Sequence, residues 1–250
     1  MKKLMIFFGL LVILGCNSED AGNCFQTEGD LVEIQVEVEP FSKIEVFERI
    51  NLVITQGDQQ KVMIQTGKNL LNEIKAEVKD GMLILKNENS CNLFRDYNTT
   101  SVHVTVTNLD YLRNSGNLAI KSNGILVLDN LWLVSENQAK DPEVRTNGDF
   151  DLELKVKILR ITSDNYSHFF LKGEAEKLDA FFAAGEGRLE GRDLMVQHCD
   201  LFHRGTNKLI VNPQQSLKGD IFSYGDIISV NRPPVVDVKE HFKGRLIFEN

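Results

Sequence analysis

Apolar and polar residues alternate one by one along much of the chain. Val32–Val38 reads V-E-I-Q-V-E-V, and a similar alternation recurs in Leu152–Val156. A period of two places successive side chains on opposite faces of a β-strand, so both segments predict half-buried strands. Shorter segments of the same kind occur at Ile50–Ile54, Lys61–Gln65, Met82–Leu85 and Val102–Thr107. The pattern predicts an all-β protein, in which Asn69–Ile74 forms one helical turn.

A five-residue segment recurs through the second half of the chain. Each copy opens with an apolar residue and closes with Gly or Asn. The copies are Leu112–Gly116, Leu133–Asn137, Ile161–Asn165, Phe181–Gly185, Leu201–Gly205 and Ile221–Gly225, and their first residues are separated by 21, 28, 20, 20 and 20 positions. A repeat of about twenty residues with short strands is typical of a solenoid, in which each coil stacks on the next.

This repeat predicts a right-handed parallel β-helix, a β-solenoid with coils of about 20 residues, preceded by an N-terminal β-rich part. Gly and Asn tolerate positive φ better than other residues, and a chain that turns a sharp corner needs such a conformation. We therefore expect Gly185, Gly205 and Gly225 to have positive φ at equivalent corners. The same register aligns Phe181, Leu201 and Ile221 in one row, which is either the core row or an outer row covered by another segment.

The first sixteen residues resemble the leader of a bacterial lipoprotein. Lys2 and Lys3 precede the apolar run Leu4–Leu14, and Gly15 precedes Cys16. The apolar run is too short to span a bilayer. The resemblance implies that residues 1–15 are a signal peptide, that Cys16 is acylated (a palmitate-type modification), and that the membrane is reached through this anchor. An ordinary signal peptide cut elsewhere is the alternative. Residues 16–24 form a polar tether, and 25–250 form one continuous domain.

Composition restricts the partners and the redox chemistry. The chain has 28 Lys and Arg against 36 Asp and Glu, a net charge of −8, which argues against nucleic acid as a partner. An oxidising envelope allows a disulfide, and Cys24 and Cys91 lie in turn-like stretches of the same N-terminal part. We expect Cys24 and Cys91 to pair and Cys199 to stay a buried thiol.

The chain resembles the head GIN domain family, also called putative auto-transporter adhesin. The resemblance is carried by Phe41–Val46, Val53–Asp58, Asp80–Leu85 and the Ser115–Asn117 corner. It covers essentially all of the chain beyond the leader and implies a right-handed parallel β-helix. The word adhesin in the family's name derives from its architecture, and the resemblance implies no catalytic residues.

Motifs for catalysis or metal binding are few. Asp164, Glu186, Arg204 and Asp226 lie near successive corners, where they form either an acid/base cluster or solvated charges. His198 and His203 are separated by an odd number of residues, which places them on opposite faces of a strand. A metal site with Cys199 is therefore disfavoured, and the sequence contains no CxxC pair and no GxSxG motif. We expect no catalytic residues, no metal and no cofactor.

Phenylalanines recur at equal steps of twenty residues. They are Phe182, Phe202, Phe222 and Phe242. If the residues before them form the core row, these four rings form an outward stripe that contacts a glycan or a surface protein. The alternatives are that another segment covers the stripe, or that the phenylalanines are themselves the core row.

Two functions are compatible with these sequence features. The leading hypothesis is a lipid-anchored, non-enzymatic protein of the cell envelope with an adhesive, binding or structural role. We expect an outer-membrane lipoprotein, periplasmic or surface-exposed. The alternative is a carbohydrate-binding or carbohydrate-active β-helix, a lyase or hydrolase, which would need carboxylates stacked within reach of one another.

Overall fold

A computed structural model describes residues 27–89, 99–137 and 139–249. Within these residues the chain is almost entirely β-structure, and the strands form one mixed sheet of sixteen strands. The strands are β1 (Leu31–Val36), β2 (Lys43–Val46), β3 (Asn51–Gln56), β4 (Lys61–Gly67), β5 (Ile74–Lys79), β6 (Met82–Asn87), β7 (Ser101–Val106), β8 (Tyr111–Asn114), β9 (Ile120–Ser135), β10 (Phe150–Ser163), β11 (His168–Phe182), β12 (Arg188–His203), β13 (Leu209–Ile221), β14 (Ile227–Ser229), β15 (Val235–Glu240) and β16 (Leu246–Phe248). All-β architecture is confirmed.

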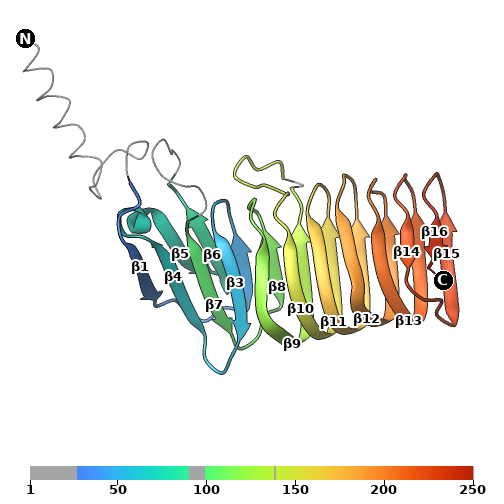
Figure 1. Cartoon of the computed structure of the whole chain (residues 1–250), viewed down its shortest axis with the longest axis horizontal. Helices are drawn as coiled ribbons and strands as arrows, with labels where there is room; N and C mark the ends of the chain where they lie inside the picture. The colour runs from blue at the N-terminus through green and yellow to red at the C-terminus, as the bar shows by residue number, and fades with distance from the viewer. Residues whose placement is uncertain (1–26, 90–98, 138, 250) are drawn as a thin grey trace, which may run out of the picture.

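The N-terminal part contains both antiparallel and parallel pairs, in the blue and green region of Figure 1. β1, β4 and β7 pair antiparallel, as do β5 and β6, whereas β3 lies parallel between β7 and β9. The strands expected from alternation are present at β1, β3, β4, β6 and β7. The helical turn is present as the 3₁₀ helix η2 (Lys68–Glu73).

The C-terminal half is a stack of parallel strands. β9, β10, β11, β12 and β13 pair in chain order, and Figure 1 shows them side by side from green to orange. β13 then pairs with both β14 and β15, and β14 pairs with β16. Because these strands pair in parallel register, residues about 20 positions apart in sequence form columns across the stack.

Each long strand bends so that both of its halves face the same interior. In β11 the alternation of buried and exposed residues breaks at Glu176 and Lys177, which are both exposed between buried Ala175 and Leu178. Because the side chains of a regular strand alternate strictly, two consecutive outward residues require the backbone to turn. The interior is filled by large apolar groups, among them Phe150 and Phe169, whose rings stack at 4.8 Å.

The interior register follows the predicted repeat over the first three segments and then departs from it. Leu112, Leu133 and Ile161 are aligned as expected. The next residues in this row are Ala180, Leu201 and Gly219, where the repeat predicts Phe181, Leu201 and Ile221. The offset between β10 and β11 is 19 residues, one fewer than the interval in the sequence. Because side chains alternate, this single residue turns Phe181 outward.

The corner glycines are explained mainly by close packing. Gly185 has the expected positive φ of 78°, but Gly205 and Gly225 do not, so the expectation is wrong for these two positions. A Cβ atom at Gly225 would lie 2.0 Å from the carbonyl oxygen of Asn207. This corner requires glycine because a neighbouring backbone leaves no space for a side chain.

The predicted boundaries at the N-terminus stay predictions. Cys16, Cys24 and Cys91 lie outside the described residues, as do the whole signal peptide and tether. Cys199 is buried, as expected, and forms no disulfide within the described part of the chain. Within the residues described, no helix is long and apolar enough to cross a membrane.

Candidate functional site

Four rings form a continuous stack on the outer surface of the parallel strands. Phe181 lies on β11, Phe202 on β12, Phe222 just after β13 and His241 just after β15. Successive ring centroids are 4.5, 5.0 and 4.3 Å apart, with interplanar angles of 22°, 37° and 3°. These separations match the strand spacing of about 4.8 Å, so each strand adds one ring. We call this set the aromatic column.

The aromatic column is open to solvent. Phe181 is 41% exposed and Phe222 is 38% exposed, and Phe202 between them is half-buried. Stacked aromatic pairs contribute about 0.5–1.5 kcal/mol beyond the burial of their area, so the rings hold one another in place. Within the stack the ring faces contact each other, so mainly ring edges face the solvent.

A hydrogen bond fixes the last ring of the column. Nε2 of His241 lies 2.6 Å from Oδ1 of Asp220, and the ring of His241 is almost parallel to that of Phe222. A carboxylate only accepts hydrogen bonds at neutral pH, so Nε2 carries the proton and donates it. The imidazole therefore continues the stack with a defined orientation.

The column ends at Thr162 on β10, which is paired in register with Phe181. On the far side of β10, β9 carries Trp132, which is 40% exposed. The indole Nε1 of Trp132 donates a hydrogen bond of 2.9 Å to Oγ1 of Thr162. Tyr111 on β8 packs edge-on against the same indole at 5.4 Å. Trp132 is paired in register with Arg160, two residues along β10 from Thr162, so the indole and the aromatic column belong to adjacent rows of the outer face.

A shallow hollow lies between Trp132 and the Phe181 end of the aromatic column. Its lining includes Trp132, Thr162, Phe181 and Phe202 together with three charged residues, Arg160, Asp179 and Asp200. The guanidinium of Arg160 lies 4.0 Å from the carboxylate of Asp179, which also pairs with Lys177 at 2.8 Å. Asp200 forms no hydrogen bond or ion pair with any described residue. The hollow therefore combines aromatic surface with donors and acceptors of hydrogen bonds.

The outward stripe predicted from the sequence is partly wrong. Phe182 is 0% exposed and packs in the core against Phe169, because β11 is shifted by one residue from the expected register. Phe202 and Phe222 do face outward. Phe242 is exposed but packs edge-on against Tyr224 at 5.1 Å, outside the column. The sequence analysis missed Phe181 and Trp132, and the latter, the only Trp of the chain, was a signal that could have been followed.

The charged residues at the corners do not form a cluster. Asp164 accepts a hydrogen bond from the backbone N–H of Asn137 at 3.0 Å, and Asp226 accepts one from that of Arg245 at 2.9 Å. Arg204 donates through Nε to the carbonyl of Ala183 at 2.6 Å. Glu186 is exposed, with no side-chain bond in the described part. Asp164, Arg204 and Asp226 thus each bond to the backbone of a neighbouring corner, and these hydrogen bonds do not join the four side chains into an acid/base cluster.

The two histidines of β12 lie on opposite faces, as the odd spacing predicts. His198 is exposed and bonds through Nδ1 to Oγ of Ser216 at 2.9 Å, whereas His203 is completely buried. Burial raises the pKa of the Cys199 thiol to about 12, which keeps it protonated and unreactive. Among the described residues no group of His, Cys, Asp and Glu could hold a metal ion.

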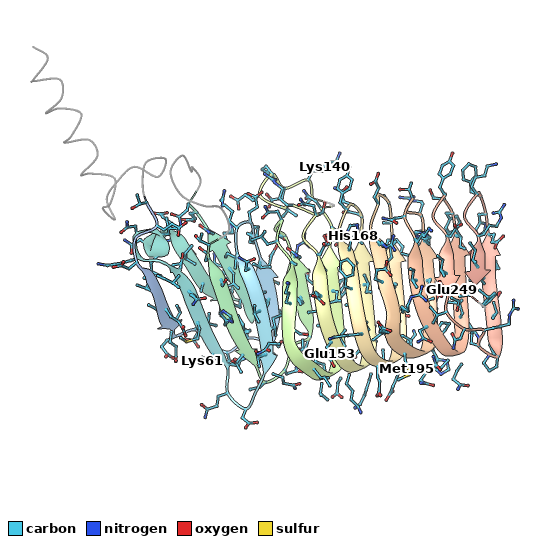
Figure 2. All side chains as sticks on the ribbon, viewed as in Figure 1. Lys61, Lys140, Glu153, His168, Met195 and Glu249 are labelled. Atoms are coloured by element: carbon cyan, nitrogen blue, oxygen red, sulfur yellow. The ribbon has the colours of Figure 1, made fainter. Side chains whose placement is uncertain are left out.

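A second, larger hollow follows the outer surface where the strands bend. It includes Asp129, Lys157, Lys155, Glu174 and Met195, and Figure 2 labels Met195 at the lower edge of the stack. Lys157 pairs with Asp129 at 2.6 Å and Lys155 with Glu174 at 3.6 Å. Acids and lysines here satisfy one another, so this surface resembles a solvated face more than a site.

The family model that matches residues 40–233 is described as putative auto-transporter adhesin, head GIN domain. The chain belongs to this family. The match covers most of the chain and includes the strands that carry Trp132 and the first three rings of the aromatic column. The resemblance noted in the sequence is thereby confirmed.

Solved structures share this fold across nearly the whole chain. A putative adhesin from Bacteroides fragilis superimposes with a TM-score of 0.77 at 19% identity, covering 89% of this chain and 99% of that one. A putative adhesin from Parabacteroides merdae has a TM-score of 0.61 at 17% identity, covering 89% and 97%. A putative lipid binding protein from Parabacteroides distasonis has a TM-score of 0.59 at 15% identity, covering 88% and 97%. No curated protein matches the chain.

Proposed function

We propose that this head GIN protein is a non-enzymatic, lipid-anchored protein of the cell envelope that binds an extended ligand through the aromatic column. Two observations support the location: the leader that ends at Cys16 and the membership of an adhesin family. Acylation of Cys16 would anchor the domain at a membrane surface, because each buried methylene contributes about 0.8 kcal/mol.

We also infer that the strands from β9 onward are the coils of a right-handed parallel β-helix. The parallel pairing of β9 to β13 and the bend within each long strand support this architecture. Such a stack is stiff and presents outward side chains in columns that extend along its axis. A long, narrow ligand could contact several coils at once.

The aromatic column is the observation that carries the proposal. Soluble proteins seldom expose rows of large apolar groups unless these contact something. Here three phenylalanine rings from consecutive strands are aligned and open to solvent. If these positions had only a structural role, charged residues like those found elsewhere on the outer faces would serve as well as phenylalanine.

A carbohydrate-active enzyme is the alternative function. That reading needs two carboxylates across one cleft, about 5 to 9.5 Å apart. The corner acids Asp164 and Asp226 are instead each bonded to a separate loop backbone. The corner acids therefore form no catalytic pair. Asp179 and Asp200 are in register on β11 and β12 and line one hollow, but the carboxylate of Asp179 is paired with Lys177 and lies 4.0 Å from the guanidinium of Arg160.

Retention of protein-bearing liposomes on coated surfaces tests the proposal. Full-length protein in fluorescent liposomes of phosphatidylethanolamine and phosphatidylglycerol is passed over mannan, hyaluronate or collagen, and retained fluorescence is measured. We expect retention on at least one coating, and a loss of most of it in the double variant Phe181→Ser, Phe222→Ser. Phe170→Ser is the matched control, because Phe170 is 43% exposed on the same strand but lies outside the column.

Equal retention of the wild type and the double variant would overturn the role of the column. Retention no greater than that of protein-free liposomes on every coating would overturn the binding function itself. Far-UV circular dichroism of each variant separates loss of contact from loss of fold.

A further inference from the structure

The hollow lies diagonally between the indole of Trp132 and the ring of Phe181. The two residues are on β9 and β11, on either side of β10, and their strands are about 9.6 Å apart. Along the strands they are also offset by two residues, because Trp132 is paired with Arg160 whereas Phe181 is paired with Thr162. The residues that line the hollow between them include Arg160 and Asp179.

Phe181 has one ring face available toward this space. Among the described residues its ring stacks with that of Phe202 alone, and Phe202 lies on the opposite side from β10. Phe202 and Phe222 are different, because each has a ring neighbour on both sides. A ligand ring in the hollow can thus contact the column at its Phe181 end.

The polar groups that line the hollow indicate what kind of ligand ring it can bind. Asp200 offers an unpaired carboxylate, Arg160 offers guanidinium donors, and the hydroxyl of Thr162 is adjacent. A cationic ligand would meet Arg160, and an acidic one would meet Asp179 and Asp200. A neutral ring that carries hydroxyl groups can both donate to the carboxylates and accept from the guanidinium.

The position of the hollow disfavours an extended peptide. β10 is paired on both sides, with β9 and β11, so no backbone edge is open for strand addition at this point. Any ligand here must be recognised through side chains on the outer face. Aromatic faces with neighbouring charged side chains suit the apolar and polar sides of a sugar ring.

We propose that the hollow between Trp132 and Phe181 binds a neutral pyranose residue of a glycan, an assignment that rests on the proposed binding function. The sugar ring lies against the free face of Phe181. Its hydroxyl groups bond to Asp200, Arg160 and Thr162. The hollow thereby determines which ligand the column accepts, and acidic sugars are rejected by the two carboxylates.

The only Trp of the chain lies in this hollow, so its fluorescence reports binding directly. Full-length protein in detergent is titrated with cellohexaose, mannohexaose or maltohexaose, and with hexagalacturonate and hexalysine for comparison. We expect a saturable change in Trp132 emission for at least one neutral hexasaccharide, with a Kd of about 10 μM to 1 mM. Hexagalacturonate and hexalysine should produce none.

Two variants locate the binding. Thr162→Phe continues the aromatic column through the hollow and should weaken binding at least tenfold while the protein remains folded. Asp200→Asn removes an acceptor charge and should weaken it about tenfold. Saturation-transfer NMR follows the sugar protons directly, so it measures both variants even if their Trp emission changes. The control Phe170→Ala should bind as the wild type does.

Three results would overturn this inference. One is the absence of any response to the neutral hexasaccharides at several millimolar. Another is undiminished binding by Thr162→Phe, which would place the ligand elsewhere. The third is saturable binding of hexalysine that Asp200→Asn abolishes, which would assign the hollow to a basic peptide. If any of these results is obtained while liposome retention still depends on the aromatic column, the proposed binding function is supported and only the assignment of a neutral pyranose to the hollow is refuted.

Discussion

Gly225 packs directly against the imidazole of His203: a Cβ atom at Gly225 would lie 2.3 Å from Nε2 of that ring. The same atom would lie 2.0 Å from the carbonyl oxygen of Asn207, which itself accepts a hydrogen bond from His203. A corner residue that follows β13 and a core residue at the end of β12 thus pack closely against each other.

This contact predicts unequal costs for two similar substitutions. Gly225→Ala should lower the free energy of unfolding by about 2 kcal/mol or more, because backbone atoms must move. Gly205→Ala should cost less, since its Cβ would lie 3.3 Å from the nearest atoms. Urea unfolding of both variants is the measurement. Equal losses would contradict the packing explanation of these corners.

His203 should make stability depend on pH. Burial lowers its pKa below the ordinary value of 6.5, while the bond to Asn207 and the charge of Asp226 act weakly in the other direction. Below pH 6.5 the unfolded state therefore binds more protons than the folded state, so stability decreases as the pH falls through this window. Above pH 6.5 the contribution of His203 is fully present.

The comparison of wild type with His203→Gln isolates this contribution. Urea midpoints are measured from pH 7.5 down to pH 5, and the other titrating groups are common to both proteins. We expect the wild type to lose stability more steeply on acidification than the variant. Parallel curves would mean that His203 titrates alike in both states.

Acylation of Cys16 is expected from the apolar run that precedes it. Cells supplied with a clickable fatty-acid analogue should label the wild type and leave Cys16→Ser unlabelled. The variant should also pass from the membrane fraction to the soluble fraction. Equal labelling of both proteins would refute the anchor.

Cys24 and Cys91 are expected to form a disulfide that leaves Cys199 free. Non-reducing peptide mapping should recover the pair, and reduction should lower stability by about 4 kcal/mol in the chain-entropy model. Cys199 should resist iodoacetamide at pH 8 until the protein is unfolded, because its thiol pKa is raised to about 12. A peptide that links Cys199 to either of the other two would end this prediction.

Alternation in the sequence was sufficient to place β1, β3, β4, β6, β7 and part of β10, because a period of two is a local property. The strand Asn51–Gln56 and the 3₁₀ helix at Lys68–Glu73 agree with expectation to within one or two residues. The alignment of Leu112, Leu133 and Ile161 also follows from the repeat. Local patterns and recurring segments therefore account for much of the architecture.

Local patterns could not predict which residues of the parallel strands face outward. Residues paired between β10 and β11 are 19 positions apart, and this offset depends on how the corner between the two strands packs. One residue of difference moves Phe182 into the core and Phe181 to the surface. The hollow also depends on Trp132 and Thr162, which are thirty residues apart. The parallel pairing of β9 and β10 brings them within hydrogen-bonding distance of each other.

The stacking within the aromatic column also affects how copies of the protein meet. Aromatic edges carry partial positive charge and faces partial negative charge, so rings attract edge to face and repel edge to edge. Along Phe202 and Phe222 the faces are already used, and the outer surface offers edges alone. Contact between two such columns along Phe202 and Phe222 would therefore be edge to edge, a geometry that lacks the edge-to-face attraction.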